Sequence, residues 1–172
     1  MKKIVLTLML SLSMLMASEY KLDQSKSKVY YDAKKDQFFS TYKIHGENTA
    51  LSGFVNLDNN NIKGELYIDA SKFTTDSSTR DSNVADDLNS ATHPKITFIY
   101  EIKKGKASGI MSVNGVSKEL TFDVIVEDQE KAVSISGEIL IKYTDFGLET
   151  PSNLILSAHD TLTIGANLSF NK

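Results

Sequence analysis

The sequence contains one arginine, Arg80, and its neighbours are the residues whose types and spacing could do chemistry. Lysine and arginine together number 19, so the other eighteen are lysines. Arg80 lies in the stretch TTDSSTRD, beside Thr75, Ser78 and Asp81. A guanidinium group holds five N–H donors in a rigid fork, which a lysine cannot reproduce. Two roles fit this pattern: Arg80 and its neighbours bind a polar head group, or Arg80 ties the loop down through a carboxylate and backbone carbonyls.

Other residue types offer weaker chemistry. The three histidines, His45, His93 and His159, lie far apart and show none of the short spacings typical of zinc sites. No serine stands in a Gly-x-Ser-x-Gly elbow. Cysteine is absent, which excludes thiol catalysis and cysteine metal sites. We therefore expect no enzyme activity, no catalytic residues, no bound metal and no cofactor.

The elements that must position Arg80 are predicted to be β-strands. Apolar side chains alternate with polar ones, and such a period of two is typical of half-buried strands. The clearest stripes are Ile96, Phe98, Tyr100 and Ile102; Leu120, Phe122, Val124 and Val126; and Leu162, Ile164, Ala166, Leu168 and Phe170. Turn residues separate the stripes at 58–61, 103–105, 114–115 and 128–130.

An antiparallel sheet with many long strands must protect its edges, and closure into a barrel does so. A sandwich is the alternative, but the long stripes favour a deep barrel. One stretch, 77–91, lacks strand character. It begins with serine and threonine and carries Val84, Ala85 and Leu88 at helical spacing, so we expect a loop with a short helix there.

The first 17 residues have the layout of a secretory signal peptide, with Lys2 and Lys3 before an apolar run and the small Ala17 at its end. The apolar run is too short to span a bilayer. We expect export to the periplasm, one domain over residues 18–172 and no stable membrane insertion. The formal net charge is −3 with charges interspersed, which argues against nucleic acid as a partner.

Six short motifs occur together along the chain: YKLDQSKSKVYYDA, LSG at 51–53, IDASKFTTDSSTRD, HPKITF, SVNGVSKELTFDV and YTDFGL. In this order the motifs resemble the YceI-like bacterial lipocalins, also called polyisoprenoid-binding proteins. The sequence departs from the family where Asn83 and Val84 replace a common His-Leu pair and where the following loop is shorter. The resemblance implies an all-β fold, an up-and-down, lipocalin-like eight-stranded antiparallel barrel with the short helix near 77–91. Members are often dimeric, so a homodimer is a further expectation.

The resemblance also implies one long-chain lipid ligand, an isoprenoid, isoprenoid quinone or fatty-acid derivative, held for transport, storage or sequestration. Its head group would lie at a mouth formed by Thr75, Ser78, Arg80 and Asp81. The expected cavity-lining residues are Val29, Tyr31, Ala33, Ile44, Val55, Leu57, Leu66, Ile68, Ile96, Phe98, Met111, Val113, Leu120, Phe122 and Val124. Two alternatives stay open: a cavity enzyme, and a stress-protection barrel packed solid with no stable lipid ligand.

Overall fold

The computed structural model describes residues 18–37, 39–58, 61–129, 131–150 and 156–172. The predicted signal peptide lies outside these residues. The strands are β1 (Ser18–Leu22), β2 (Lys28–Gln37), β3 (Ser40–Asn48), β4 (Leu51–Asp58), β5 (Asn61–Asp69), β6 (Lys95–Lys103), β7 (Lys106–Val113), β8 (Val116–Gln129), β9 (Ala132–Lys142) and β10 (Leu156–Asn171). The helices are α1 (Ser78–Asp87) and the short 3₁₀ turns η1 (Gln24–Lys26), η2 (Ala70–Lys72) and η3 (Thr144–Phe146).

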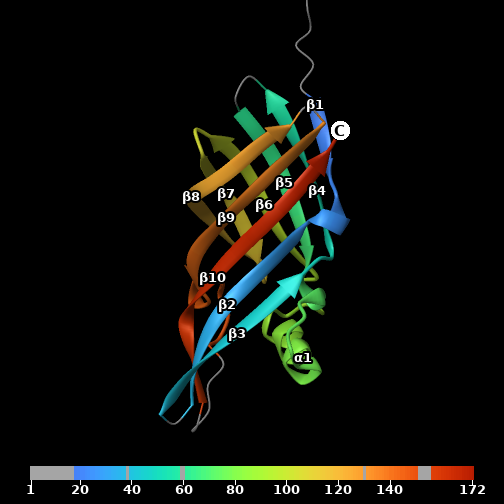
Figure 1. Cartoon of the computed structure of the whole chain (residues 1–172). Coiled ribbons are helices and arrows are strands. Elements are labelled where there is room, and N and C mark those ends of the chain that lie inside the picture. Colours follow the sequence, from blue (N-terminus) through green and yellow to red (C-terminus); the bar gives the residue numbers. More distant parts are fainter. Residues whose placement is uncertain (1–17, 38, 59–60, 130, 151–155) are drawn as a thin grey trace, which may run out of the picture.

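The strands form a closed antiparallel barrel of eight strands, β1 and β4 to β10 (Figure 1). Closure comes from β1, which pairs with β4 on one side and with the end of β10 on the other. The hairpin β2–β3 continues the sheet because β2 pairs with the earlier part of β10. The predicted barrel is thus confirmed, and the sandwich is wrong.

Two tight turns set the register of neighbouring strands. Lys104 and Gly105 between β6 and β7 have φ values of 50° and 75°, and Asn114 and Gly115 between β7 and β8 have 50° and 76°. Positive φ at both central residues is the type I′ turn, whose twist matches that of a two-residue hairpin. Both turns lie where the sequence predicted them.

The barrel interior is filled in the half that contains β1. Val55, Val133 and Phe170 are each 0% exposed there. The Phe98 ring stacks on Tyr100 with centroids 5.0 Å apart and on Phe122 at 5.8 Å. Such offset aromatic pairs fill the space across a small barrel. A bore open along its whole length is therefore absent from the described barrel.

At the other end, α1 lies across the mouth of the barrel, near the β2–β3 hairpin (Figure 1). Its N-cap is Ser77, whose Oγ accepts from the Arg80 backbone N–H at 3.4 Å. Thr74 joins the preceding segment to β3 by two backbone hydrogen bonds with Glu47, of 2.8 and 2.9 Å. The predicted short helix is confirmed. No helix among the described residues is both long and apolar enough to cross a membrane.

Candidate ligand-binding cavity

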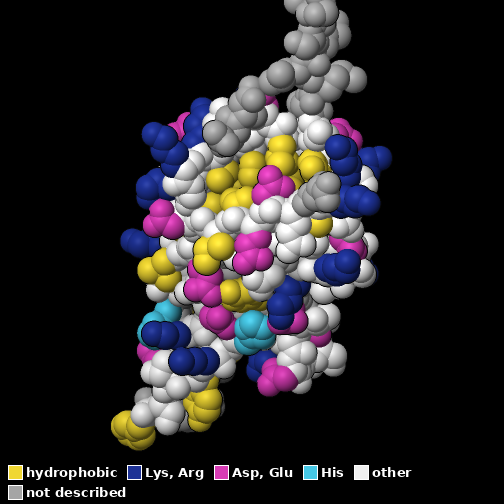
Figure 2. Space-filling view, turned by 45° about the horizontal axis from the view of Figure 1, so that its top comes forward, with side chains coloured by type: hydrophobic (Ala, Val, Ile, Leu, Met, Phe, Trp, Pro, Cys, Tyr) yellow, Lys and Arg dark blue, Asp and Glu magenta, His cyan; other side chains and the backbone are white. Residues whose placement is uncertain are grey.

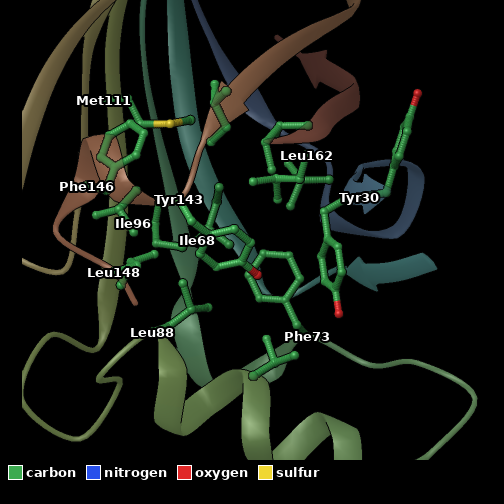
Figure 3. A pocket seen from close by; sticks show the side chains of 16 residues that line it. Tyr30, Ile68, Phe73, Leu88, Ile96, Met111, Tyr143, Phe146, Leu148 and Leu162 are labelled. Atoms are coloured by element: carbon green, nitrogen blue, oxygen red, sulfur yellow. The ribbon is translucent and has the colours of Figure 1, made fainter. Parts of the chain in front are cut away.

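An apolar cavity occupies the α1 half of the barrel (Figure 3). Its walls come from β2, β5, β6, β7, β9 and β10, and α1 and η3 close it with Val84, Leu88 and Phe146. The layer of Ile68, Ile96 and Val113 surrounds the cavity, and Met111 lies one layer deeper beside Phe98. The stacked Phe98 and Tyr100 belong to the buried core beyond Met111 and do not line the cavity.

The cavity volume is about 70 Å³. One water molecule needs about 10–15 Å³ on this measure, so the cavity is several times that size. It is also well below the roughly 300–1,000 Å³ of typical small-molecule sites. In this conformation the cavity has room for no more than the end of one slender apolar chain, and anything larger would require its walls to move.

The predicted cavity residues divide into three groups. Those that line the cavity are Val29, Tyr31, Ile68, Ile96, Met111 and Val113. Ala33 and Ile44 lie outside it, in a groove at its mouth. Val55, Leu66 and Phe98 are buried in the core, and Leu57, Leu120, Phe122 and Val124 pack against that core while half-buried. Alternation identified the inward face of each strand but did not separate the cavity layers from the filled ones.

Several cavity residues were missed from the sequence. They come mainly from the second half of the chain and from non-strand segments: Tyr30, Phe73, Val84, Leu88, Ile141, Tyr143, Phe146, Leu148, Leu162 and Ile164. The sequence did indicate that four of them face inward: Leu162 and Ile164 belong to the alternating stripe at 162–170, and Val84 and Leu88 recur at helical spacing. Nothing local in the sequence shows that η3, which lies far from α1 along the chain, contributes to the same cavity.

Three side chains separate the cavity from the groove outside: Tyr31, Val84 and Tyr143 line both. Tyr31 is 5% exposed, and burial raises the pKa of its hydroxyl. Burial, followed by the negative charge of Asp87, raises the pKa of Tyr143 to about 12. Both tyrosines therefore stay protonated at neutral pH and present O–H donors at the boundary.

The groove at the cavity mouth, called the mouth groove below, runs between α1 and the β2–β3 hairpin. Its polar lining residues are Lys34, Lys35, Ser77, Thr79, Arg80, Asn83, Asp87 and His159. Its apolar lining continues the cavity wall through Ala33, Ile44 and Ala158. The arrangement passes from an apolar interior, through two tyrosine hydroxyls, to a charged exterior.

The predicted mouth residues take different roles. The Asp81 carboxylate ties down the loop before α1, because its Oδ1 accepts from both the backbone N–H and the Oγ1 of Thr75, each at 2.7 Å. Arg80 pairs with Asp76 one turn earlier on the surface and lines the mouth groove. Ser78 is exposed at the start of α1 and is not among the groove residues. Arg80 thus has a carboxylate partner, whereas the loop contacts expected of it are made by Asp81.

The histidines pair with separate carboxylates. His45 contacts Asp32 at 2.7 Å and Glu47 at 3.2 Å, and His159 contacts Asp36 at 2.9 Å. Hydrogen bonds to Asp32 and then Glu47 raise the pKa of His45. Histidines lie beside lysines and carboxylates in the lower part of Figure 2, and charges of both signs alternate over that face. In the part of the chain that the structure describes, no three His, Asp or Glu side chains gather as a metal site.

The sequence was then compared with known protein families. A family model described as the YceI-like domain matches residues 20–170. This chain belongs to the YceI-like family. The predicted family is therefore confirmed, and the match runs from within β1 to within β10.

Two solved structures share the barrel. BcnA from Burkholderia cenocepacia is 21% identical with a TM-score of 0.70, over 86% of this chain and 98% of BcnA. The YceI protein of Campylobacter jejuni is 20% identical with a TM-score of 0.67, over 80% of this chain and 90% of that protein. At such identities the likeness establishes the fold. No match was found among curated proteins.

Proposed function

We propose that this YceI-like protein binds one long-chain amphiphile, with the end of its apolar tail in the cavity and its head in the mouth groove. The observation that carries the proposal is the cavity itself, whose lining is apolar apart from tyrosine hydroxyls. An isoprenoid, an isoprenoid quinone or a fatty-acid derivative has the required slender tail. The role is transport, storage or sequestration in the periplasm, without catalysis.

The energetics favour a ligand with a substantial tail. Each buried methylene contributes about 0.8 kcal/mol, so about ten of them contribute roughly 8 kcal/mol. Association removes several kcal/mol through lost ligand freedom. The cavity of about 70 Å³ holds only part of such a tail, so uptake must be accompanied by movement of its walls.

Helix α1 is the wall best suited to move. It contains no buried residue, although Val84 and Leu88 reach the cavity. Elements with few buried apolar contacts open at low free-energy cost. Displacement of α1 would join the cavity to the mouth groove, since Val84 belongs to both linings.

The proposal is tested by native mass spectrometry of protein purified from its host, followed by lipid addition to the delipidated protein. A bound molecule with an apolar tail, or one-to-one uptake of added palmitate or a quinone, is the expected result. A Val113→Phe variant should block uptake, whereas the exposed Ser52→Ala variant should retain it. No uptake of any chain by the wild-type protein would reject the proposal. Cell fractionation tests the periplasmic location.

One observation favours a different role. The β1 half of the barrel is filled, with Val55, Val133 and Phe170 fully buried, which suits a stress-protection barrel with no stable ligand. The two roles differ in their response to lipid. A packed barrel would show no rise in thermal stability when lipids are added, whereas a binding protein is stabilised in proportion to ligand concentration over Kd.

A further inference from the structure

Lys35 ends the inward-facing stripe of β2. Val29, Tyr31, Ala33 and Lys35 alternate along one face of that strand, and the first two line the cavity. Ala33 and Lys35 continue into the mouth groove, where Lys35 is half-buried. Its Cα neighbours across the sheet are Tyr42 of β3 and Ala158 of β10. A tail that followed this face out of the cavity would therefore reach an ammonium group.

The ammonium group of Lys35 is available to a ligand. Within the described residues, no carboxylate lies at ion-pair distance from it. The spacing is also suitable, because four residues of strand separate Tyr31 from Lys35, about 13 Å at about 3.3 Å per residue. The lysine stem can fold back over apolar neighbours such as Ile44 and shorten that path.

Arg80 is the second cation on this path. It lines the mouth groove together with Lys35, and both also line a second groove beside β3. Arg80, Val84 and Asp87 recur at helical spacing on α1 and all line the mouth groove. Arg80 lies in the first turn of α1, while Asp87 is its last residue, and the charge of Asp87 acts on Tyr143 at the cavity boundary.

Charge in the mouth groove contrasts with the whole protein. The groove lining includes three cationic side chains, Lys34, Lys35 and Arg80, and one carboxylate, Asp87. Asp76 beside the groove already pairs with Arg80 through part of its guanidinium fork, so three cations and two carboxylates leave an excess of one positive charge when the His159–Asp36 pair is left out of the count. The complete chain has a formal net charge of −3. An anion is therefore attracted to the outer part of the groove, and Asp87 opposes its entry into the apolar interior.

We propose that the bound amphiphile carries an anionic head, a carboxylate or phosphate, which pairs with Lys35 and Arg80 in the mouth groove. This inference rests on the proposed function, because the tail must occupy the cavity. Arg80 offers a guanidinium fork suited to either oxyanion, and Lys35 offers a point charge. An amphiphile with the same tail but a neutral head makes neither charged contact.

The test compares heads on one tail. Palmitate and palmityl alcohol each compete with a neutral fluorescent dye, N-phenyl-1-naphthylamine, for the cavity of the wild-type protein. Palmitate should compete about 10-fold more strongly, which is the effect of one to two charge-assisted hydrogen bonds. The double variant Lys35→Gln with Arg80→Gln should abolish that preference and leave the alcohol unchanged. Lys21→Gln, at the exposed β1 end, is the matched control and should retain it.

The outcomes separate the two proposals. If neither compound displaces the dye or binds the protein, the proposed function fails. If both bind equally and the double variant changes neither, the tail site stands and the anionic-head inference is overturned. Direct titration with acetate and inorganic phosphate tests whether the groove binds free anions without a tail. If either anion binds as tightly as palmitate, the anionic-head inference is also overturned. Circular dichroism of each variant verifies that the barrel remains folded.

Discussion

The ring of Tyr31 on β2 lies across Gly46 on β3, at the boundary between the cavity and the mouth groove. The two residues are direct partners in the β2–β3 register. A Cβ atom added at Gly46 would lie 2.6 Å from the Tyr31 Cζ and 2.8 Å from its Oη. The Tyr31 ring also packs against Phe73, with centroids 5.7 Å apart. The absence of a side chain at Gly46 thus sets the position of the aromatic ring that bounds the cavity.

Replacement of Gly46 by valine should displace Tyr31 and destabilise the protein. A forced shift of a packed ring typically costs about 1–3 kcal/mol, measured as a lower midpoint in urea unfolding. The cavity boundary should also open, which would increase the rate of dye exchange. Ser52→Ala, at an exposed strand position, should stay within about 0.5 kcal/mol of wild type. Wild-type stability in Gly46→Val would show that Tyr31 is free to move.

Replacement of valine by leucine at two positions should show which half of the barrel contains the cavity. Val113 lines the cavity, whereas Val133 is 0% exposed in the filled half. An added methylene in Val113→Leu should enter the cavity and leave the free energy of unfolding unchanged or slightly higher. In Val133→Leu it should overpack the core and cost about 1–3 kcal/mol. Equal costs at the two positions, by urea unfolding, would contradict the division of the barrel into two halves.

The fold was largely predictable because several barrel strands, β6, β8 and β10 most clearly, have an alternating stripe that reports their inward face. The turns at Lys104–Gly105 and Asn114–Gly115 were also predictable, since few residues adopt positive φ without strain. Closure through β1 was not visible, because its pairing with β10 joins opposite ends of the chain. That contact depends on barrel geometry rather than on local sequence.

The candidate site was only partly predictable, because alternation reports the face of a strand but not its depth in the barrel. Ile96 and Phe98 belong to one stripe, yet Ile96 lines the cavity and Phe98 stacks on Tyr100 in the filled core. Arg80 illustrates a second limit. Its five N–H donors suggested that it anchors the loop, but the adjacent Asp81 makes the contacts to that loop. Which of the two side chains faces the loop depends on where α1 begins, at Ser78.

Removal of the Tyr100 hydroxyl should not destabilise the protein. Among the described side chains, the Oη atoms of Tyr31 and Tyr100 are buried without a hydrogen-bond partner. A buried polar group without a partner carries a desolvation cost of about 1–3 kcal/mol. Tyr100→Phe should therefore keep or raise the free energy of unfolding, by up to about 1 kcal/mol in urea titrations. Loss of more than that would reveal an internal partner, such as a buried water.

Release of the loop before α1 should accelerate ligand exchange. Asp81→Ala removes the acceptor of two hydrogen bonds from Thr75, and the loss of such a cap-like contact typically costs about 0.5–2 kcal/mol. Stopped-flow measurement of dye release should show a faster rate, with the equilibrium affinity less affected. The exposed Asp86→Ala on the same helix is the control. Unchanged release from Asp81→Ala would show that α1 does not control access.

Stability should depend on the protonation of His45. Its hydrogen bonds with Asp32 and Glu47 raise its pKa above the ordinary value of 6.5, so the folded protein binds the proton more tightly than the unfolded chain. The stabilisation is complete below about pH 6.5 and is lost as the pH rises through the folded-state pKa. Thermal unfolding from about pH 5.5 to 8.5 should therefore show wild type losing its advantage over His45→Gln as the pH rises. The effect should be small and weakened by salt, because the three side chains are exposed. A difference between the two proteins that stays constant across this range would contradict the assignment.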